Sequence, residues 1–215
     1  METSTIHRDT TVAKKKSLPA ALWALTISAF AIGTTEFVIV GLLSTVANDL
    51  GTSLTSAGLL VSLYAIGVAI GAPILTALTG KIPRKQLLMG IMLLFIIGNG
   101  LAAISPSFEL LLLSRVVTGF AHGVFFSIGS TIAASLVPKD KRATAISIMF
   151  AGLTVAIVTG VPLGTYIGQN FGWRATFIGV AILGAIGAIA SLALVPKNIK
   201  QSEPLRLIDQ LKVIK

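Results

Sequence analysis

Long apolar stretches separated by short polar segments dominate this sequence. Six of the stretches are close to or above the roughly 20 residues that an α-helix needs to cross a bilayer. Strands of a membrane barrel would be shorter and would alternate polar with apolar residues, which these stretches do not. The pattern predicts six membrane-spanning helices, at residues 18–43, 57–80, 87–104, 109–136, 143–168 and 175–195.

Composition supports this interpretation. The chain has 215 residues, of which 54% are hydrophobic and 12% charged, and its mean hydropathy is +0.90. A soluble domain of this length would need more polar surface, so an all-α integral membrane protein is expected. The absence of cysteine excludes disulfides and thiolate chemistry.

Three segments make up the chain. We expect a polar, cytoplasmic N-terminal segment at residues 1–17, a six-helix transmembrane bundle at 18–195 and a cytoplasmic linker at 196–215. In the linker, Leu205, Ile208 and Leu211 are spaced for one helical face, with basic residues elsewhere. A short interfacial helix and a plain linker both fit this pattern.

The basic residues set the orientation. The net charge is +9, and 15 of the 17 lysines and arginines fall on one side of a six-span model. They are Arg8, Lys14, Lys15, Lys16, Lys81, Arg84, Lys85, Lys139, Lys141, Arg142, Lys197, Lys200, Arg206, Lys212 and Lys215. By the positive-inside rule this side is cytoplasmic, and so are both termini. The basic charge thus orients the protein in the membrane and does not indicate a nucleic-acid partner.

Two of the six stretches contain charged or ionisable residues. Glu36 lies within the first, and Arg115 and His122 lie within the fourth, whose first residue is Glu109. The first helix runs outward and the fourth inward, so Glu36 and Arg115 each lie roughly 10 Å from the outer end of their span and can meet at one depth. His122 is on the Arg115 face of its helix and about 10 Å deeper.

Three roles fit Glu36. An ion pair with Arg115 would hold two helices together. A carboxylate that exchanges protons would have its charge balanced by Arg115, because burial favours the neutral acid and a nearby cation favours the ionised one. Contact with a substrate alone is the third role. For His122, both a packing role and a relay role remain open.

Enzymatic chemistry finds no support. No pair of catalytic acids, HExxH, GxSxG or phosphate-binding loop occurs, so an enzyme is not expected. We also expect no cofactor and no metal site.

Small residues recur in the fifth stretch, at Gly152, Ala156, Gly160, Gly164 and Gly168. Such a stripe lets helix backbones approach closely, for static packing or for a sliding contact. Pro162 within this stretch removes a backbone hydrogen bond and is expected to bend the helix.

The second and fifth stretches also correspond to each other. Gly71-Ala72-Pro73 and Gly160-Val161-Pro162 occupy similar places in the two blocks of three helices. Two successive blocks with an odd number of spans have opposite orientation, so the pattern indicates a 3+3 inverted repeat.

Several motifs in this order resemble one membrane-protein family. They are Gly33-Thr34-Thr35-Glu36-Phe37, the GKIPRK loop, Arg115-Val-Val-Thr-Gly119 with Ala121-His122-Gly123, the GVPLG stretch, and Phe171-Gly172-Trp173-Arg174. Together they resemble the N-terminal half of a major facilitator superfamily transporter. The resemblance is to the drug:proton antiporter group and its sugar-efflux, arabinose efflux permease-like branch, and it covers residues 18 to about 198.

The resemblance implies roles for particular residues. It makes Glu36 and Arg115 the proton-coupling pair and places His122, Phe125 and Phe126 in the lining of a central substrate cavity. The loop after the second helix matches the family's gating motif, and the fifth helix matches its antiporter motif. The gating residues are Leu78, Lys81, Arg84 and Lys85, and the antiporter residues are Gly160, Pro162 and Gly164.

The function implied is proton-coupled efflux of a small organic solute, such as a sugar or drug, across the bacterial inner membrane by alternating access. The partners are then the solute, protons, the lipid bilayer and a C-terminal six-helix half. The alternative is a six-span membrane fragment or scaffold without transport activity of its own, because family members have twelve spans and this chain has six.

Overall fold

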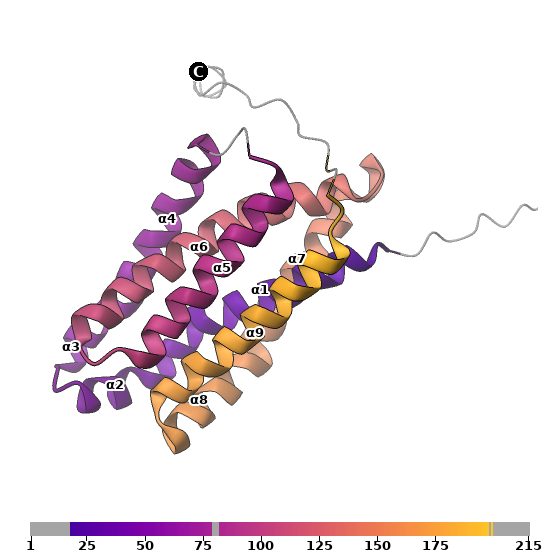
Figure 1. The fold of residues 1–215 in the computed structure, drawn as a ribbon. Coiled ribbons are helices and arrows are strands. Elements are labelled where there is room, and N and C mark those ends of the chain that lie inside the picture. Colours follow the sequence, from indigo (N-terminus) through magenta and orange to yellow (C-terminus); the bar gives the residue numbers. More distant parts are fainter. Residues whose placement is uncertain (1–17, 79–81, 198, 200–215) are drawn as a thin grey trace, which may run out of the picture.

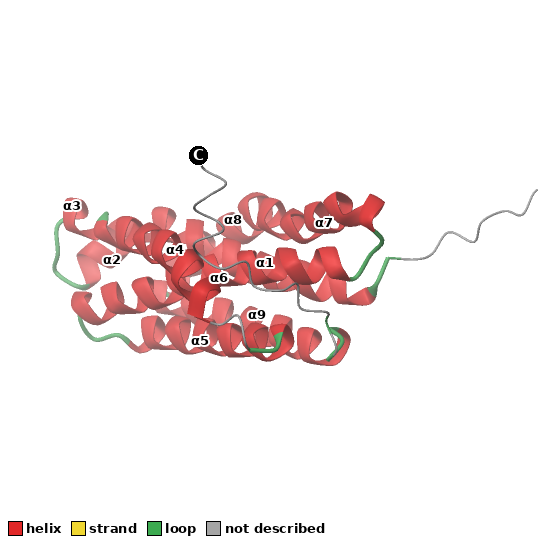
Figure 2. Ribbon diagram, turned by 90° about the horizontal axis from the view of Figure 1, so that it is seen from above, coloured by secondary structure: helices red, strands yellow, loops and turns green. Residues whose placement is uncertain are grey.

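The computed structural model describes residues 18–78, 82–197 and 199 (Figure 1). Six of its helical segments are long and apolar enough to cross a membrane, which confirms the predicted spans. Every regular element within the described ranges is helical (Figure 2). The elements are α1 (Ala20–Val38), a 3₁₀ turn (Ile39–Leu42), α2 (Leu43–Asp49), α3 (Leu54–Ala57), α4 (Leu59–Leu78), α5 (Arg84–Ile104), α6 (Phe108–Ser135), a second 3₁₀ turn (Lys139–Lys141), α7 (Arg142–Val155), a π-helical turn (Ala156–Gly160), α8 (Val161–Phe171) and α9 (Trp173–Leu194).

The helices pack in a pattern with internal two-fold symmetry. The first span, α1, packs against the fifth, α7–α8, and the sixth, α9. The fourth span, α6, packs in the same way against the second, α4, and the third, α5. The third and sixth spans contact each other. Exchanging the first three spans with the last three therefore reproduces the contacts named above, as expected for an inverted repeat.

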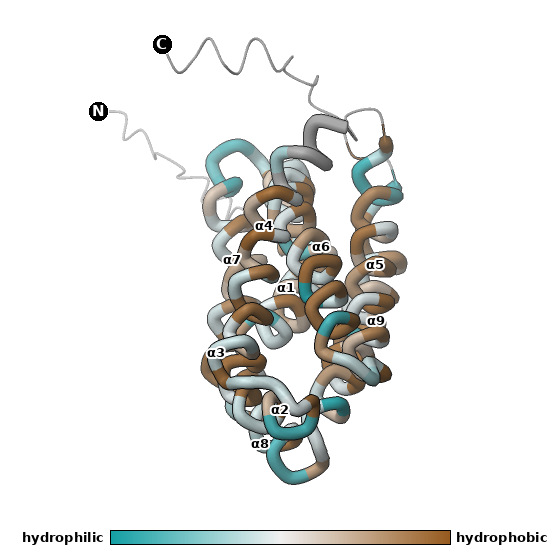
Figure 3. The backbone as a smooth tube through the Cα atoms, turned by 90° about the vertical axis from the view of Figure 1, so that its left-hand side faces the viewer, coloured by the Kyte–Doolittle hydropathy of each residue, from teal (hydrophilic) through white to brown (hydrophobic). Residues whose placement is uncertain are grey.

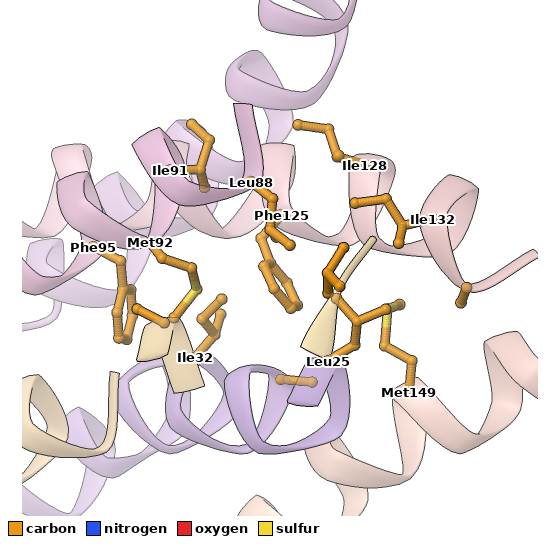
Figure 4. Packing of buried hydrophobic residues seen from close by; sticks show 14 of the residues in the cluster. Leu25, Ile32, Leu88, Ile91, Met92, Phe95, Phe125, Ile128, Ile132 and Met149 are labelled. Atoms are coloured by element: carbon orange, nitrogen blue, oxygen red, sulfur yellow. The ribbon is translucent and has the colours of Figure 1, made fainter. Parts of the chain in front are cut away.

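The apolar core lies between α1, α5, α6 and α9 (Figure 4). Leu25 and Ile32 of α1 face Leu88 and Met92 of α5 and Phe125 of α6, and all five are fully buried. A second cluster lies nearer the α2 end of the bundle, around Val38, Leu42, Leu111 and Phe177. Hydrophilic residues gather toward the two ends of the bundle, and the helices between are mostly hydrophobic (Figure 3).

The first and fifth spans are not continuous α-helices. The π-helical turn Ala156–Gly160 ends one residue before the Val161-Pro162 start of α8. Pro162 has no N–H to offer the carbonyl four residues earlier, so the hydrogen-bond register widens in the preceding turn. The effect of Pro162 on the helix is thus a π-helical turn in the residues just before the proline.

Some predictions fall outside the described part of the chain. The segment 1–17, the possible interfacial helix at 204–215 and Lys81 of the gating loop lie there. Leu78 is the last residue of α4, and its side chain is not described.

Candidate functional site

Arg115 is fully buried in the middle of the bundle, with 1% of its surface exposed. Its guanidinium donates hydrogen bonds to three main-chain carbonyls: Leu60 on α4 at 3.2 Å, Thr35 on α1 at 2.9 Å and Glu36 on α1 at 3.4 Å. A rigid fork of N–H donors suits this arrangement, in which one side chain joins three helices.

The end of α1 supplies one of these acceptors. The N–H of Ile39 bonds to the carbonyl of Phe37, two residues back, where α1 ends and the 3₁₀ turn begins. The carbonyl of Thr35, four residues before Ile39, is thereby left without its usual helical partner and accepts from Arg115.

Glu36 lies beside Arg115, but the two side chains do not form an ion pair within the described residues. Arg115 binds the main chain of Glu36 instead. The basic side chain nearest the Glu36 carboxylate is His122, whose Nδ1 is 3.7 Å from Oε2. The Glu36 side chain is 26% exposed. The ion pair with Arg115, one of the three roles that the sequence allowed for Glu36, is thus replaced by a hydrogen bond from Arg115 to the α1 backbone.

Tyr64 of α4 completes the cluster. Its hydroxyl is 2.9 Å from Nδ1 of His122, and its ring lies under the Arg115 guanidinium, with 4.1 Å between Cζ and the ring centroid. Tyr64 is 2% exposed. We define the polar cluster as Glu36, Tyr64, Arg115 and His122, contributed by α1, α4 and α6.

Aromatic rings extend from the polar cluster toward α7. The rings of His122 and Phe126 are 4.8 Å apart, and those of Phe126 and Phe150 are 4.9 Å apart. Phe150 is 39% exposed. Phe125, in contrast, is fully buried among core residues of α1 and α5 (Figure 4). The structure therefore places Phe126 beside the polar cluster and Phe125 in the core behind it, with 5.3 Å between the two ring centroids.

The gating-motif residues that the structure describes lie at the end of the helix bundle opposite α2 (Figure 1). Arg84 and Lys85 are not in the loop but in the first turn of α5, which begins directly after Pro83. Lys85 donates to the carbonyls of Leu192 and Val195 at 2.6 and 2.5 Å. A cation is favourable at the C-terminus of a helix, so Lys85 joins the start of α5 to the end of α9.

The small residues of the fifth span face α1 and the 3₁₀ turn that follows it. A Cβ on Gly152 would meet the main-chain carbonyl of Thr26, and one on Gly160 would meet the hydroxyl of Thr34. At Gly164 a Cβ would lie 2.7 Å from Val38. This stripe therefore serves close packing inside the bundle, whereas Pro162 is exposed.

At the α2 end of the bundle, Arg174 and Trp173 bind the same carboxylate. Asp49 Oδ2 accepts from Trp173 Nε1 at 2.9 Å and from Arg174 at 2.5 Å, and Arg174 also donates to the Ser105 carbonyl at 2.9 Å. Arg174 is one of the two basic residues outside the cytoplasmic set of 15. It links α2, α9 and the connection between α5 and α6.

Sequence reasoning missed Tyr64 and the bond between Thr35 and Asn99. Thr35 donates to Asn99 Oδ1 at 2.6 Å, and both residues are fully buried. A signal existed for Tyr64, because a tyrosine inside an apolar span needs a partner for its hydroxyl. The identity of that partner could not be read from the sequence.

Fold and site together define a multi-pass helical membrane protein with a charged cluster in its interior. Residues 25–214 match the family model described as Major Facilitator Superfamily. The chain belongs to this superfamily, whose members are transporters.

Three relatives illustrate the match. The chain is 57% identical over 204 residues to the uncharacterized MFS-type transporter YtbD of Bacillus subtilis, covering 95% of this chain and 51% of the relative. It is 39% identical to the chloramphenicol resistance protein of Streptomyces lividans, covering 83% of this chain and 46% of that protein. With the putative transporter AraJ of Escherichia coli it shares 37% identity, over 79% of this chain and 43% of that protein.

Solved structures show the same fold. A crystal structure of the peptide transporter POT in complex with sulfate superposes with a TM-score of 0.75 at 18% identity, covering 91% of this chain and 43% of that one. The chain thus spans about half the length of the relatives it matches.

Proposed function

We propose that this chain is the N-terminal half of a proton-coupled exporter of a small organic solute, working by alternating access. The observation that carries the proposal is a single carboxylate, Glu36, in contact with His122 inside the bundle and beside a fully buried arginine. Ionisable groups inside membrane spans are costly and mark ion or proton pathways.

Arg115 supplies a fixed positive charge. Its three bonds to carbonyls of α1 and α4 hold the guanidinium in place whatever the charge of Glu36. Burial favours the neutral acid and the neighbouring cation favours the carboxylate, so a change in the access of water to Glu36 shifts the balance between its two charge states. A group poised in this way can bind a proton from one side of the membrane and release it to the other.

The cavity wall of this half is assigned to Glu36, His122 and Phe126. His122 and Glu36 retain partial exposure, and Phe126 is partly buried and leads to the exposed ring of Phe150. The partners in this proposal are the solute, protons, the bilayer and a C-terminal six-helix half. Both termini are assigned to the cytoplasmic side of a bacterial inner membrane, on the distribution of basic residues.

The test uses proteoliposomes that contain this chain co-expressed with the C-terminal half of the Bacillus subtilis relative. Radiolabelled chloramphenicol and arabinose serve as probes, since one relative is named for chloramphenicol resistance and the motifs resemble a sugar-efflux branch. An imposed pH gradient should drive export by the wild type. Glu36→Gln should abolish the response to the gradient while solute exchange without a gradient persists.

The matched control is Glu109→Gln, because Glu109 is an exposed glutamate at the start of α6. This variant should behave as the wild type. Gradient-driven export that survives unchanged in Glu36→Gln would refute proton coupling through this residue.

The competing function is a six-span fragment or scaffold without transport activity. The fact that points to it is that the chain spans about half the length of its relatives, and this fact supports it only weakly. Proteoliposomes with this chain alone distinguish the two: the exporter proposal expects no solute export from the chain alone and recovery on co-expression, whereas the scaffold expects none in either case.

A further inference from the structure

Tyr64 has one hydrogen-bond partner within the described residues, Nδ1 of His122 at 2.9 Å. If the imidazole nitrogen carried the proton and donated it, the buried hydroxyl would have to place its own proton elsewhere, and no second acceptor is present among those residues. A buried hydroxyl without an acceptor is costly. The Tyr64 O–H is therefore the donor and Nδ1 the acceptor.

This bond determines where His122 carries its proton. A neutral imidazole has one N–H and one unprotonated nitrogen, and the bond made by one nitrogen sets the state of the other. With Nδ1 accepting from Tyr64, the proton lies on Nε2. Nε2 bonds to no group in the described part of the chain, which also contains no fully buried polar side-chain atom without a partner. It therefore accounts for part of the 10% exposure of the His122 side chain.

The same bond affects Glu36. Its Oε2 is 3.7 Å from Nδ1, which is longer than a hydrogen bond. Because Nδ1 already accepts from Tyr64, it has no proton to donate to the carboxylate. Glu36 is thus kept out of an ion pair with the imidazole, and its side chain stays 26% exposed.

The phenol ring is itself held in place. The Arg115 guanidinium lies against one face of the ring, and the main-chain carbonyl of Tyr64 packs directly on Gly119 of α6. The charged side chains of the neighbouring helices α5 and α7 lie in their first turns, many residues from the part of each helix that is level with Tyr64. They are Arg84 and Lys85 of α5 and Arg142 of α7.

We propose that Tyr64 is a positioning residue that fixes His122 as an N–H donor toward the solute and leaves Glu36 free as an acceptor. The pair then suits a solute group that both accepts and donates a hydrogen bond, such as a hydroxyl or an amide. The inference rests on the proposed function only in placing a solute beside this pair.

The test is magnetic resonance of the imidazole nitrogens in lipid vesicles that contain the chain with ¹⁵N-labelled histidine. The sequence has 2 histidines, so His7→Gln leaves His122 as the single signal. We expect the shift of an unprotonated nitrogen at Nδ1 and of a protonated nitrogen at Nε2. A protonated Nδ1 in this background would overturn the proposal without any further variant.

Two tyrosine variants complete the experiment, since the sequence has 2 tyrosines. Tyr64→Phe keeps the ring against Arg115 and removes the O–H, so the single tautomer should be lost and a protonated fraction should appear at Nδ1. Tyr166→Phe, at an exposed tyrosine of α8, should leave the spectrum unchanged. An unchanged spectrum in Tyr64→Phe would also overturn the proposal.

This measurement needs no solute and no pH gradient. Failure of the export assay therefore contradicts the proposed function and leaves the tautomer result standing, whereas a protonated Nδ1 contradicts the role of Tyr64 alone.

Discussion

The guanidinium carbon of Arg115 lies 4.1 Å from the centroid of the Tyr64 ring. The edges of the same guanidinium donate to carbonyls of α1 and α4, so its face and its edges are both occupied. A planar, delocalised cation can make both kinds of contact at once, and an ammonium group cannot. Arg115 is therefore a structural centre of the bundle as well as a charge beside Glu36.

We expect Arg115→Lys to lower the free energy of unfolding by about 2–4 kcal/mol, because hydrogen bonds to a charged group contribute about 1.5–3 kcal/mol each and lysine cannot replace the set. Denaturant unfolding in micelles, followed by circular dichroism, measures the change. Arg142→Lys, at an exposed position at the start of α7, is the control and should stay within about 0.5 kcal/mol of the wild type. Equal effects at the two positions would contradict the role given to Arg115.

Gly119→Ala should separate α4 from α6. The new Cβ would collide with the main-chain carbonyl of Tyr64, which cannot move without the helix that carries it. Overpacking of this kind costs about 1–3 kcal/mol, and we expect a loss of stability in that range. Because the collision falls at Tyr64, the ¹⁵N spectrum of His122 should change as well.

Gly179→Ala is the matched control for this substitution. A Cβ on Gly179 of α9 meets no other group within 4 Å, so alanine should be neutral or stabilise the helix by up to about 1 kcal/mol. Loss of stability in the control and none in Gly119→Ala would contradict the close contact between α4 and α6.

The Asp49 cluster predicts an order of effects. Asp49→Asn keeps an oxygen that accepts from Trp173 and loses the ion pair with Arg174, which is partly exposed and contributes about 0–1 kcal/mol. Asp49→Ala also leaves the buried indole N–H without its acceptor, at a cost of about 1–3 kcal/mol. In thermal unfolding, Asp49→Ala should therefore have a lower melting temperature than Asp49→Asn.

The exposed Asp140, in the connection between α6 and α7, gives the comparison for a carboxylate whose side chain has no such partners among the described residues. Asp140→Ala should change stability little. The reverse order, with Asp49→Asn the more damaging, would show that charge and not the indole bond dominates the cluster.

Orientation in the membrane can be tested because the chain has no cysteine. Thr55→Cys, in α3, should react with a membrane-impermeant maleimide added to intact cells, whereas Lys139→Cys should react only in inverted vesicles. Both positions are exposed. Reaction of Lys139→Cys in intact cells, and of Thr55→Cys only in inverted vesicles, would contradict the orientation assigned from the basic residues.

The sequence by itself determined the number of spans and singled out Glu36, Arg115 and His122 inside them. Both are local properties, since hydropathy is a sum over one stretch and a charge in an apolar helix is conspicuous. The depth argument likewise brought Glu36 and Arg115 to the same level, because helical rise is constant.

Only the tertiary structure decided which atoms meet. Arg115 binds carbonyls of α1 and not the Glu36 carboxylate, and Tyr64 bonds to His122, 58 positions later in the chain. Phe125 is buried in the core, and Lys85 binds a carbonyl at the end of α9. The physical reason lies in helix rotation. Spans that are apolar all round carry little periodic signal to fix which face turns inward, so their rotation is set by close packing of glycines and by the partners that buried polar groups require.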